Sequence, residues 1–175
     1  MIAVAKHLKV VLPEELEGLF REHSKFIYRT AYRVTGNGED AEDVLQTLFV
    51  RLMRRELPTE FGRNPKGYLY RAAVNLALNV VRSRKVSTDA FHVVDVPTSR
   101  EKSRGESDLD EAVRQALGEL KNRAAEILIL RHVHGYSDVE IANLLGTSRG
   151  TIAVSLFRSR ARLRKLIRAY LGVKP

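Results

Sequence analysis

Apolar residues recur at helical spacing along most of this chain. The period runs from residue 13 to about 85 and again from about 108 to 171, and strand signals are scarce. The turn at 36–38 separates a first predicted helix from a second, whose start Asp40 is expected to cap. An apolar stripe marks this second helix: Leu45, Leu48, Phe49 and Leu52. The pattern predicts an all-α protein.

A loop over residues 56–67 and a third long helix starting at Tyr68 complete the first block. Its predicted buried stripe includes Leu69, Ala72, Ala73, Leu76 and Val80. Its opposite face carries Arg71, Asn75, Asn79 and Arg82. Arginine grips phosphate, asparagine pairs with base edges, and Tyr68 could stack on an unpaired base. A solvated polar face, with Tyr68 and Tyr70 packed in the core, explains this helix equally well.

Residues 86–107 have no sustained period. They are rich in serine, threonine and charge, and contain Pro97 and Gly105. Such a composition predicts a flexible linker. The chain therefore divides into one helical domain over 13–85 and a second over 108–171, which begins with helices expected at 109–120 and 122–134.

The second domain ends in two short helices joined by a tight turn. Ser137 and Glu140 form a capping-box pattern at the start of the first of these helices. Gly146 suits the left-handed conformation that ends it, and Ser148 can cap the next helix. This is the pattern of a helix-turn-helix that places its second helix in a DNA groove.

The second of these helices has two distinct faces. Ile152, Leu156, Leu163 and Ile167 share an apolar face. The other face is polar and cationic: Thr151, Ser155, Arg158, Arg162 and Lys165. No acidic residue follows Arg149, whereas a merely solvated helix usually mixes both signs. DNA binding is therefore favoured over an ordinary basic surface helix.

Composition agrees with a polyanionic partner. The 175 residues carry a formal net charge of +9 and a pI near 10.0, which favours nucleic acid or an anionic membrane surface. The chain has no cysteine, which excludes disulfides and thiolate metal sites and fits a reducing cytosol. No apolar run approaches the ~18 residues of a membrane span. Residues 1–15 are interpreted as a short extension rather than a signal peptide, and a cytoplasmic protein without membrane insertion is expected.

Signals for catalysis are weak. The sequence has no phosphate-binding glycine loop with its lysine, no HExxH zinc motif and no GxSxG elbow. His132 and His134 are two residues apart and so point in different directions on one helix. Carboxylates at 40, 42 and 43 open a helix, where the macrodipole favours them. No enzyme activity, metal or cofactor is expected.

Three segments together resemble an extracytoplasmic-function sigma factor of bacterial RNA polymerase. They are DAEDVLQTLFVRL (40–52), NPKGYLYRAAVNLALNVVRSRK (64–85) and YSDVEIANLLGTSRGTIAVSLFRSRARLRKL (136–166). The resemblance implies two helical domains, called regions 2 and 4, and a chain that guides transcription initiation without being a catalyst. The implied partners are the β′ clamp helices and β flap of core polymerase, promoter DNA, and an anti-sigma factor of the kind that holds most relatives inactive.

The resemblance also assigns roles to residues by position. The segment that docks on the clamp helices contains Asp40, Asp43, Gln46, Phe49 and Arg51. Positions that open and read the −10 element on the non-template strand are Asn64, Lys66, Arg71, Asn75 and Asn79. Positions that read the −35 element as duplex are Arg149, Thr151, Ser155, Arg158 and, nearby, Arg162.

Two departures from the family pattern change these expectations. Tyr68 stands where the helix usually begins with tryptophan, so the stacking or packing role there is altered. Ala153, Val154 and Ser155 stand where a lysine and an arginine are usual in the recognition helix. Contacts are therefore expected to shift to Arg149 and Arg158, or toward DNA shape.

Two other classes of function remain open from the sequence. A two-domain helix-turn-helix regulator would bind operator DNA as a dimer, without polymerase, and use its first block to sense a ligand or dimerise. A membrane-surface or RNA-binding helical protein would spread basic residues over both blocks without an ordered turn motif.

Overall fold

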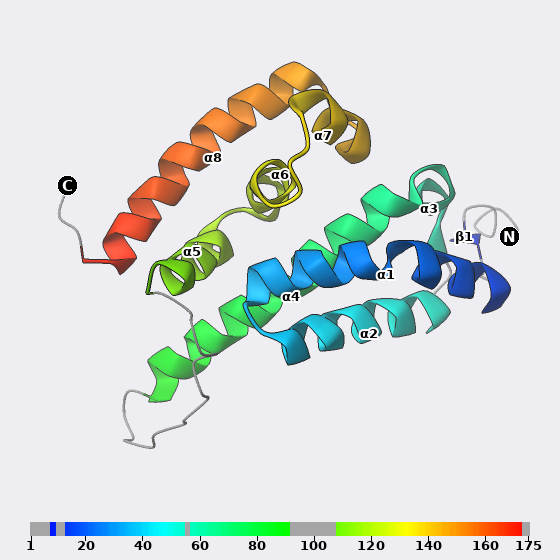
Figure 1. Cartoon of the computed structure of the whole chain (residues 1–175), viewed down its shortest axis with the longest axis horizontal. Helices are drawn as coiled ribbons and strands as arrows, with labels where there is room; N and C mark the ends of the chain where they lie inside the picture. The colour runs from blue at the N-terminus through cyan, green and yellow to red at the C-terminus, as the bar shows by residue number, and fades with distance from the viewer. Residues whose placement is uncertain (1–7, 10–12, 55–56, 92–107, 173–175) are drawn as a thin grey trace, which may run out of the picture.

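The structure is a computed structural model that describes residues 8–9, 13–54, 57–91 and 108–172. Helices account for nearly all of these residues (Figure 1). They are α1 (Pro13–Thr35), α2 (Gly38–Arg54), α3 (Thr59–Arg63), α4 (Pro65–Phe91), α5 (Asp108–Glu119), α6 (Asn122–His132), α7 (Asp138–Leu145) and α8 (Arg149–Tyr170). Two short strands, β1 (Leu8–Lys9) and β2 (Leu57–Pro58), pair antiparallel, with Leu8 opposite Pro58. The predicted all-α class is confirmed.

The helices form two bundles, as the sequence predicts. We call α1–α4 the N-terminal bundle and α5–α8 the C-terminal bundle. In Figure 1 the α8 helix and the α2 helix lie on opposite sides of the molecule, with α1, α4 and α6 between them. This arrangement leaves the outer faces of α2 and α8 free of the other bundle.

The turn between α1 and α2 is capped by a residue other than the predicted one. Gly36 takes a left-handed conformation with φ of 71°, and the chain then turns into α2. The side-chain oxygen of Asn37 accepts hydrogen bonds from the backbone N–H of Glu39 (2.7 Å) and of Asp40 (3.3 Å). Asp40, the predicted cap, instead lies within the first turn and forms an ion pair with Arg84 of α4.

The boundaries of α4 also differ from the expected ones. The helix begins at Pro65 rather than at Tyr68, because proline is well suited to a first helical turn. The preceding loop contains the short helix α3. At its other end α4 continues to Phe91 and so extends into the predicted linker. The rest of that linker, residues 92–107, lies outside the described residues.

One hydrophobic cluster belongs to the N-terminal bundle alone. It joins α1, α2, α3 and α4 through Ile27, Leu48, Phe49, Leu52, Phe61, Leu69 and Ala73. The rings of Phe20 and Phe49 meet edge to face, with centroids 4.9 Å apart. The predicted apolar stripes of the second and third helices are therefore confirmed where they face this cluster.

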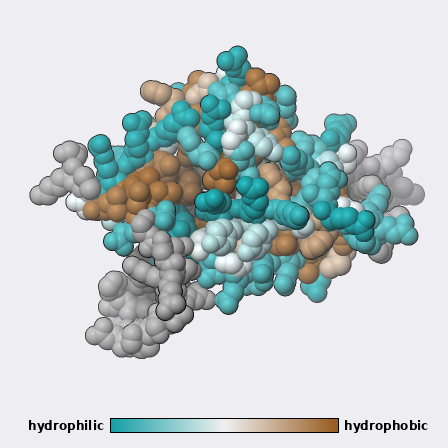
Figure 2. Space-filling view, viewed as in Figure 1, coloured by the Kyte–Doolittle hydropathy of each residue, from teal (hydrophilic) through white to brown (hydrophobic). Residues whose placement is uncertain are grey.

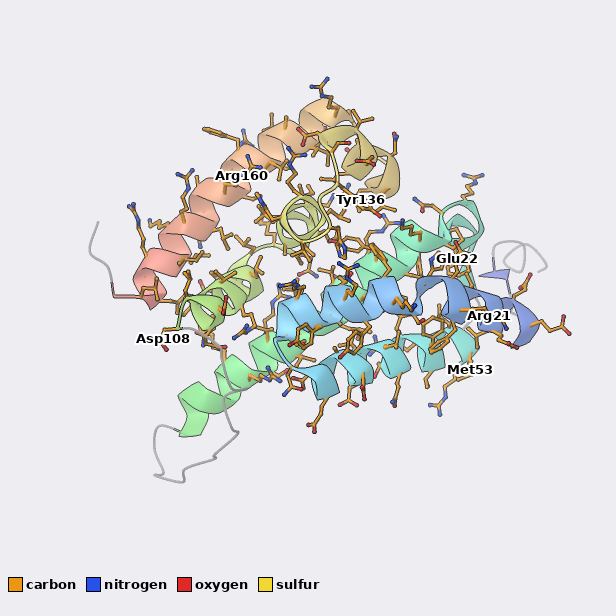
Figure 3. All side chains as sticks on the ribbon, in the orientation of Figure 1. Arg21, Glu22, Met53, Asp108, Tyr136 and Arg160 are labelled. Atoms are coloured by element: carbon orange, nitrogen blue, oxygen red, sulfur yellow. The ribbon has the colours of Figure 1, made fainter. Side chains whose placement is uncertain are left out.

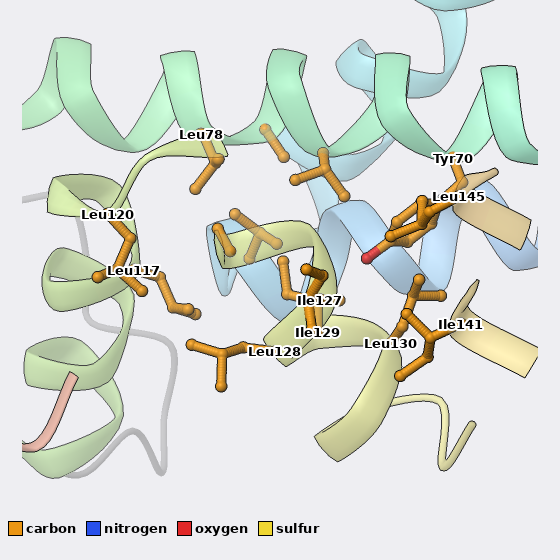
Figure 4. Packing of buried hydrophobic residues seen from close by; sticks show 14 of the residues in the cluster. Tyr70, Leu78, Leu117, Leu120, Ile127, Leu128, Ile129, Leu130, Ile141 and Leu145 are labelled. Carbon is orange, nitrogen blue, oxygen red and sulfur yellow. The ribbon is translucent and has the colours of Figure 1, made fainter. Parts of the chain in front are cut away.

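A second, larger cluster joins the two bundles (Figure 4). On α4, Tyr70, Val74 and Leu78 form a second apolar face that is fully buried against α6 and its neighbours. From the C-terminal bundle the cluster takes Leu117, Leu120, Ile127, Leu128, Leu130, Ile141 and Leu145. The α4 helix is thus buried on two sides, and the two bundles share one core.

A buried hydrogen bond accompanies this packing. The Tyr70 hydroxyl donates to the backbone carbonyl of Glu126 at 2.6 Å. Burial, together with the nearby Glu126 charge, raises the pKa of Tyr70 well above its usual value, so the hydroxyl keeps its proton. Burial likewise raises the pKa of the Glu126 carboxyl, although Arg123 lies 3.4 Å away and opposes the shift.

The local signals of the helix-turn-helix are confirmed. Ser137 accepts a hydrogen bond from the Glu140 N–H, and the Glu140 side chain accepts one from the Ser137 N–H, which completes a capping box. Gly146 adopts φ of 64° at the end of α7. Ser148 accepts a hydrogen bond from the Thr151 N–H at the start of α8. Sequence-local chemistry therefore sets the angle between α7 and α8.

His134 lies at the seam between the bundles. Its ring centroid is 4.6 Å from that of Phe26 on α1 and 6.2 Å from that of Tyr70 on α4. Its Nε2 atom is 2.9 Å from the Thr30 hydroxyl. Burial, followed by the charges of Arg29, Lys66 and Arg33, lowers the pKa of His134 to about 4. The imidazole is therefore neutral at pH 7.

Acidification should destabilise the fold through His134. Its pKa is about 4 when folded and near 6.5 when unfolded, so the unfolded chain takes up the proton first. The stabilisation is complete above pH 6.5 and is lost as the pH falls toward 4. Between pH 7 and pH 5, uptake of this proton by the unfolded chain lowers the free energy of unfolding by at most about 2 kcal/mol. Urea unfolding at pH 7 and pH 5 measures the loss. The His134→Gln variant should lose less of its free energy of unfolding between pH 7 and pH 5 than the unmodified chain. Equal losses in the two proteins would contradict this role of His134.

Candidate nucleic-acid interface

The α8 helix presents a polar face to solvent because its apolar face is held by the C-terminal bundle. Ile152 and Leu156 are buried, and Ser159, a small residue on the same side, is buried with them. Thr151, Arg158 and Arg162 are exposed on another side of the helix. The capped turn at Ser148 fixes where this face begins. These features are those of a recognition helix that is ready to enter a groove.

The predicted −35 residues share α8 but differ in exposure. Arg149 occupies its first turn and is exposed, as are Arg158 and Arg162. The Thr151 hydroxyl lies 2.8 Å from the Ser148 hydroxyl, so the N-cap uses part of its hydrogen-bonding capacity. Ser155 is half-buried. The structure therefore offers three arginines to DNA more freely than the two hydroxyl groups.

Two apolar residues on the exposed side of α8 were not among the sequence candidates. The Phe157 side chain is 77% exposed and Val154 is 51% exposed. Solvent-facing apolar groups on a recognition helix can contact thymine methyl groups in the major groove. Helical spacing alone indicates them, since both fall outside the stripe formed by Ile152 and Leu156. Val154 occupies one of the positions at which the family pattern has basic residues, and Phe157 lies close to them on the same helix.

A basic pocket of about 330 Å³ lies beside Phe157. It is lined by Arg131, Asp138, Ala153, Leu156, Phe157, Arg160 and Arg164. Arg160, marked in Figure 3, donates from Nε to His132 Nε2 at 3.3 Å. Burial, followed by the charges of Arg160 and Arg131, lowers the pKa of His132, so its nitrogen can accept this bond. The concentration of guanidinium groups suits contact with backbone phosphates.

The predicted −10 residues lie along α4 and the turn before it, and several face the C-terminal bundle. Asn64 and Asn75 hydrogen-bond to residues of that bundle. Arg71 is half-buried, near Glu126. Lys66 and Asn79 are exposed. The structure places four of these residues on α4 and Asn64 directly before it, and it leaves only part of the set open to solvent.

The aromatic residues near this segment have separate environments. Tyr70 is in the shared core, as the alternative interpretation of this helix expects. Tyr68 is half-buried and meets the Phe61 ring edge to face, with centroids 5.3 Å apart. Tyr68 therefore packs on α3 while keeping one side accessible.

All five predicted polymerase-binding residues lie on α2, but they differ in exposure. Asp43, Gln46 and Arg51 are exposed on its outer surface. Asp40 is half-buried through its ion pair with Arg84. Phe49 is only 6% exposed and belongs to the core of the N-terminal bundle. The apolar stripe of α2 turns Phe49 toward α1, so its ring is not open to a partner here, and its role in polymerase binding stays a prediction.

Other kinds of site receive no support from the described residues. Within the described ranges, no group of three or more His, Cys, Asp or Glu side chains could hold a metal ion. His23 is buried in the N-terminal bundle. Across the helices that the structure describes, none has both the length and the apolar character needed to cross a bilayer.

Comparison with known proteins identifies the family. The profile described as sigma-70 region 2 matches residues 19–86, and that of sigma-70 region 4 matches residues 110–163. The RNA polymerase sigma-E factor of Streptomyces coelicolor is 31% identical over 160 residues, which cover 86% of this chain and 85% of that protein. This chain belongs to the extracytoplasmic-function sigma factors. It is thus a member of a regulatory family that is not catalytic.

Other sigma factors show similar agreement. The extracytoplasmic-function sigma factor SigE of Mycolicibacterium smegmatis is 32% identical over 152 residues, which cover 83% of this chain and 59% of that protein. SigW of Bacillus subtilis is 26% identical, with 81% of this chain and 83% of that protein covered. Among solved structures, CnrH in complex with the cytosolic domain of CnrY shares the fold, with a TM-score of 0.52, 21% identity and 90% of each chain covered.

Replacing Phe157 should weaken duplex DNA binding without weakening the fold. Because the ring is exposed, Phe157→Ala should change the free energy of unfolding by less than about 0.5 kcal/mol. We expect the affinity for promoter duplex to fall by about 1 kcal/mol, or roughly fivefold, through lost apolar contact. Fluorescence anisotropy measures the affinity. Met53→Ala, which removes another exposed apolar side chain, on α2, is the control, and equal affinities of the two variants would contradict a role for Phe157.

Proposed function

We propose that this sigma factor directs RNA polymerase to promoters through residues on three separate surfaces. The outer face of α2 binds core polymerase, α4 with its preceding turn reads the −10 element, and α8 reads the −35 element. The observation that carries this proposal is the exposed, arginine-bearing face of α8, presented by a fully capped helix-turn-helix. Membership of the sigma family supports the same division of roles.

At the −35 element, affinity comes mainly from phosphate contacts. Arg162 projects from α8, and Arg160 and Arg164 line the adjacent basic pocket. Neutralising phosphates releases counterions, so binding should fall steeply as salt rises. Arg149 and Arg158, together with the apolar Val154 and Phe157, supply the base contacts in place of the missing basic residues. The sequence preference therefore combines guanine and thymine recognition.

Core polymerase binds two exposed protein surfaces in this proposal. On the N-terminal bundle, Asp43, Gln46 and Arg51 meet the clamp helices of β′. On the C-terminal bundle, Figure 2 shows hydrophobic side chains gathered over α5 and the C-terminal half of α8, where Leu109 and Leu171 are exposed. We assign this apolar strip to the β flap, because solvent-exposed apolar patches mark protein contacts.

Polymerase adds specificity by holding the two DNA-binding modules at a set distance. Each module alone binds weakly, and linking them converts the second contact into an intramolecular event. At the −10 element, melting exposes bases whose edges Asn64, Asn75 and Asn79 recognise, while Lys66 and Arg71 contact the backbone. The protein works with the polymerase in the cytoplasm. Phosphodiester chemistry remains with the polymerase, and an anti-sigma partner stays a prediction from family resemblance.

Transcription with core polymerase tests the function as a whole. Purified chain plus bacterial core enzyme should produce discrete run-off transcripts from genomic fragments, and mapping their start sites should reveal common −35 and −10 elements. Core enzyme alone is the control. If the chain instead bound operator DNA as a dimer on size exclusion and gave no specific initiation with core, the alternative of a dimeric helix-turn-helix regulator would replace this proposal.

Removing the Arg158 guanidinium should weaken promoter recognition. If it contacts a base, Arg158→Ala should cost about 1–3 kcal/mol of binding to the mapped promoter and relax preference at one position. The matched control is Arg168→Ala, another exposed arginine of α8 that lies about 15 Å further along the helix. Anisotropy titrations at fixed salt give both values. Equal losses in the two variants would show a general charge effect instead.

A further inference from the structure

The C-terminal half of α1 carries a basic surface that lies outside the three proposed binding surfaces. Lys25, Arg29 and Arg33 are exposed and lie about one turn apart, so they follow one side of the helix. The sequence has no acidic residue between Glu22 and Glu39. The helix macrodipole favours cations within the last turn, which accounts for Arg33 but not for Lys25 and Arg29, one and two turns earlier. This half of α1 therefore carries charge of a single sign for another reason.

These three cations have no acidic partner in the part of the chain that the structure describes. None of the ion pairs between described residues includes Lys25, Arg29 or Arg33. Arg21, labelled in Figure 3 and one turn before Lys25, differs, because its Nη2 atom lies 2.6 Å from Oε1 of Glu17. A row of cations without internal counter-charges attracts a polyanion.

Two tyrosines border the row of cations on α1. The rings of Tyr28 and Tyr32 are stacked, with centroids 6.2 Å apart and planes inclined by 18°. Tyr28 is half-buried, and a Cβ atom added at Gly38 would lie 3.5 Å from its hydroxyl oxygen, so this tyrosine lies against the start of α2. Tyr32 is 43% exposed. The pair therefore offers solvent an aromatic ring that its neighbour holds in place, which is what a platform for an unpaired base requires.

This surface continues from the residues predicted to contact the −10 element. The exposed Lys66, at the start of α4, places its ammonium 5.1 Å from the ring centroid of Phe26 on α1. After burial, the charges of Arg29, Lys66 and Arg33 are what lower the pKa of His134, so the three cations lie around one ring. In Figure 1 the α1 helix crosses in front of α4, and Figure 2 shows mostly hydrophilic side chains there. Positive charge therefore extends from α4 along α1.

We propose that the α1 surface holds the unpaired promoter strand adjoining the −10 element. It consists of five residues: Lys25, Tyr28, Arg29, Tyr32 and Arg33. The cations contact successive phosphates, and one base stacks on Tyr32. Every base has a π-face, so this contact does not depend on base sequence and prolongs the open complex without changing promoter choice. The inference rests on the proposed function, since α4 is the element proposed to bind the same strand.

The chemistry of the α1 surface favours a nucleic-acid strand over an acidic protein. An acidic protein segment would need only the cations, whereas a strand with unpaired bases also uses the stacked tyrosines. Arginine, which provides two of the three cations, matches phosphate through its planar fork. Continuity with Lys66 places the surface where a strand leaving α4 would pass.

Binding of the free protein to a fluorescent oligothymidine, followed by anisotropy over a salt series, tests the cations. The double variant Arg29→Ala with Arg33→Ala should bind the oligonucleotide at least fivefold more weakly. Its slope of log K against log salt should be shallower by about 1.4, since each phosphate contact on a single strand accounts for about 0.7. The matched control is Arg21→Ala, an exposed arginine of the same helix, which should change the affinity less than twofold. Affinity for a −35 duplex should stay within twofold in both variants.

Substitution of Tyr32 tests the stacking contact separately from charge. Tyr32→Ala should weaken oligothymidine binding at least threefold. Tyr32→Phe should bind within twofold of the unmodified chain, because a phenyl ring still stacks on a base. Equal losses in the two variants would overturn the stacking role.

The lifetime of the open complex with core polymerase connects this binding to initiation. The double arginine variant should shorten the lifetime at least threefold while initiating at the same start sites. Equal effects of Arg21→Ala and the double variant would overturn the inference. So would a loss of affinity for core polymerase with unchanged oligothymidine binding, which would make α1 a protein contact. Failure of the unmodified chain to initiate from any promoter with core polymerase would instead reject the proposed function.

Discussion

Burial of the second apolar face of α4 against the C-terminal bundle is the interaction on which the rest of this structure depends. Tyr70, Val74 and Leu78 contribute to a core that would be exposed to water if the bundles separated. The Tyr70 hydroxyl adds a buried hydrogen bond to the backbone of α6. Because burial of apolar area is the main favourable term in folding, this face decides how the two bundles are placed.

Polar side chains of the same helix complete the hydrogen bonding of the C-terminal bundle. Its amides and guanidinium groups suit the bases and phosphates of an unpaired strand, but here they complete the hydrogen bonding of the neighbouring bundle. A polar group that is satisfied inside the protein costs little, whereas one left unpaired in an interface costs more. The polar groups of α4 that face the C-terminal bundle are therefore satisfied within the protein, whereas Lys66 and Asn79 stay exposed.

The two exposed helices α2 and α8 differ in the charges on their surfaces. The outer side of α2 carries both signs of charge, which suits a protein partner, whereas α8 has no acidic residue and suits DNA. Between them, neutral His134 and buried Glu126 lie close to several arginines, and burial disfavours the charged form of each. The seam between the bundles is thus more sensitive to pH than the exposed arginine face.

Local chemistry allowed the sequence to predict the helices, the capping box at Ser137, the left-handed Gly146 and the basic face of α8, because each depends on residues within about one helical turn. The aperiodic, polar composition of residues 86–107 indicated the division into two domains, and family resemblance agreed with it. The structure differs from the sequence predictions in two details: Asn37 rather than Asp40 caps α2, and α4 begins at Pro65 rather than at Tyr68. Phe49, which the sequence placed both in the apolar stripe and in the polymerase-binding segment, faces the core. The tertiary structure alone decided that the bundles share a core, since the periodicity of α4 shows that a face is apolar but cannot show which distant helix covers it. That choice depends on contacts between residues far apart in the chain, such as Tyr70 with Glu126, and it determines which polar groups of α4 are open to solvent.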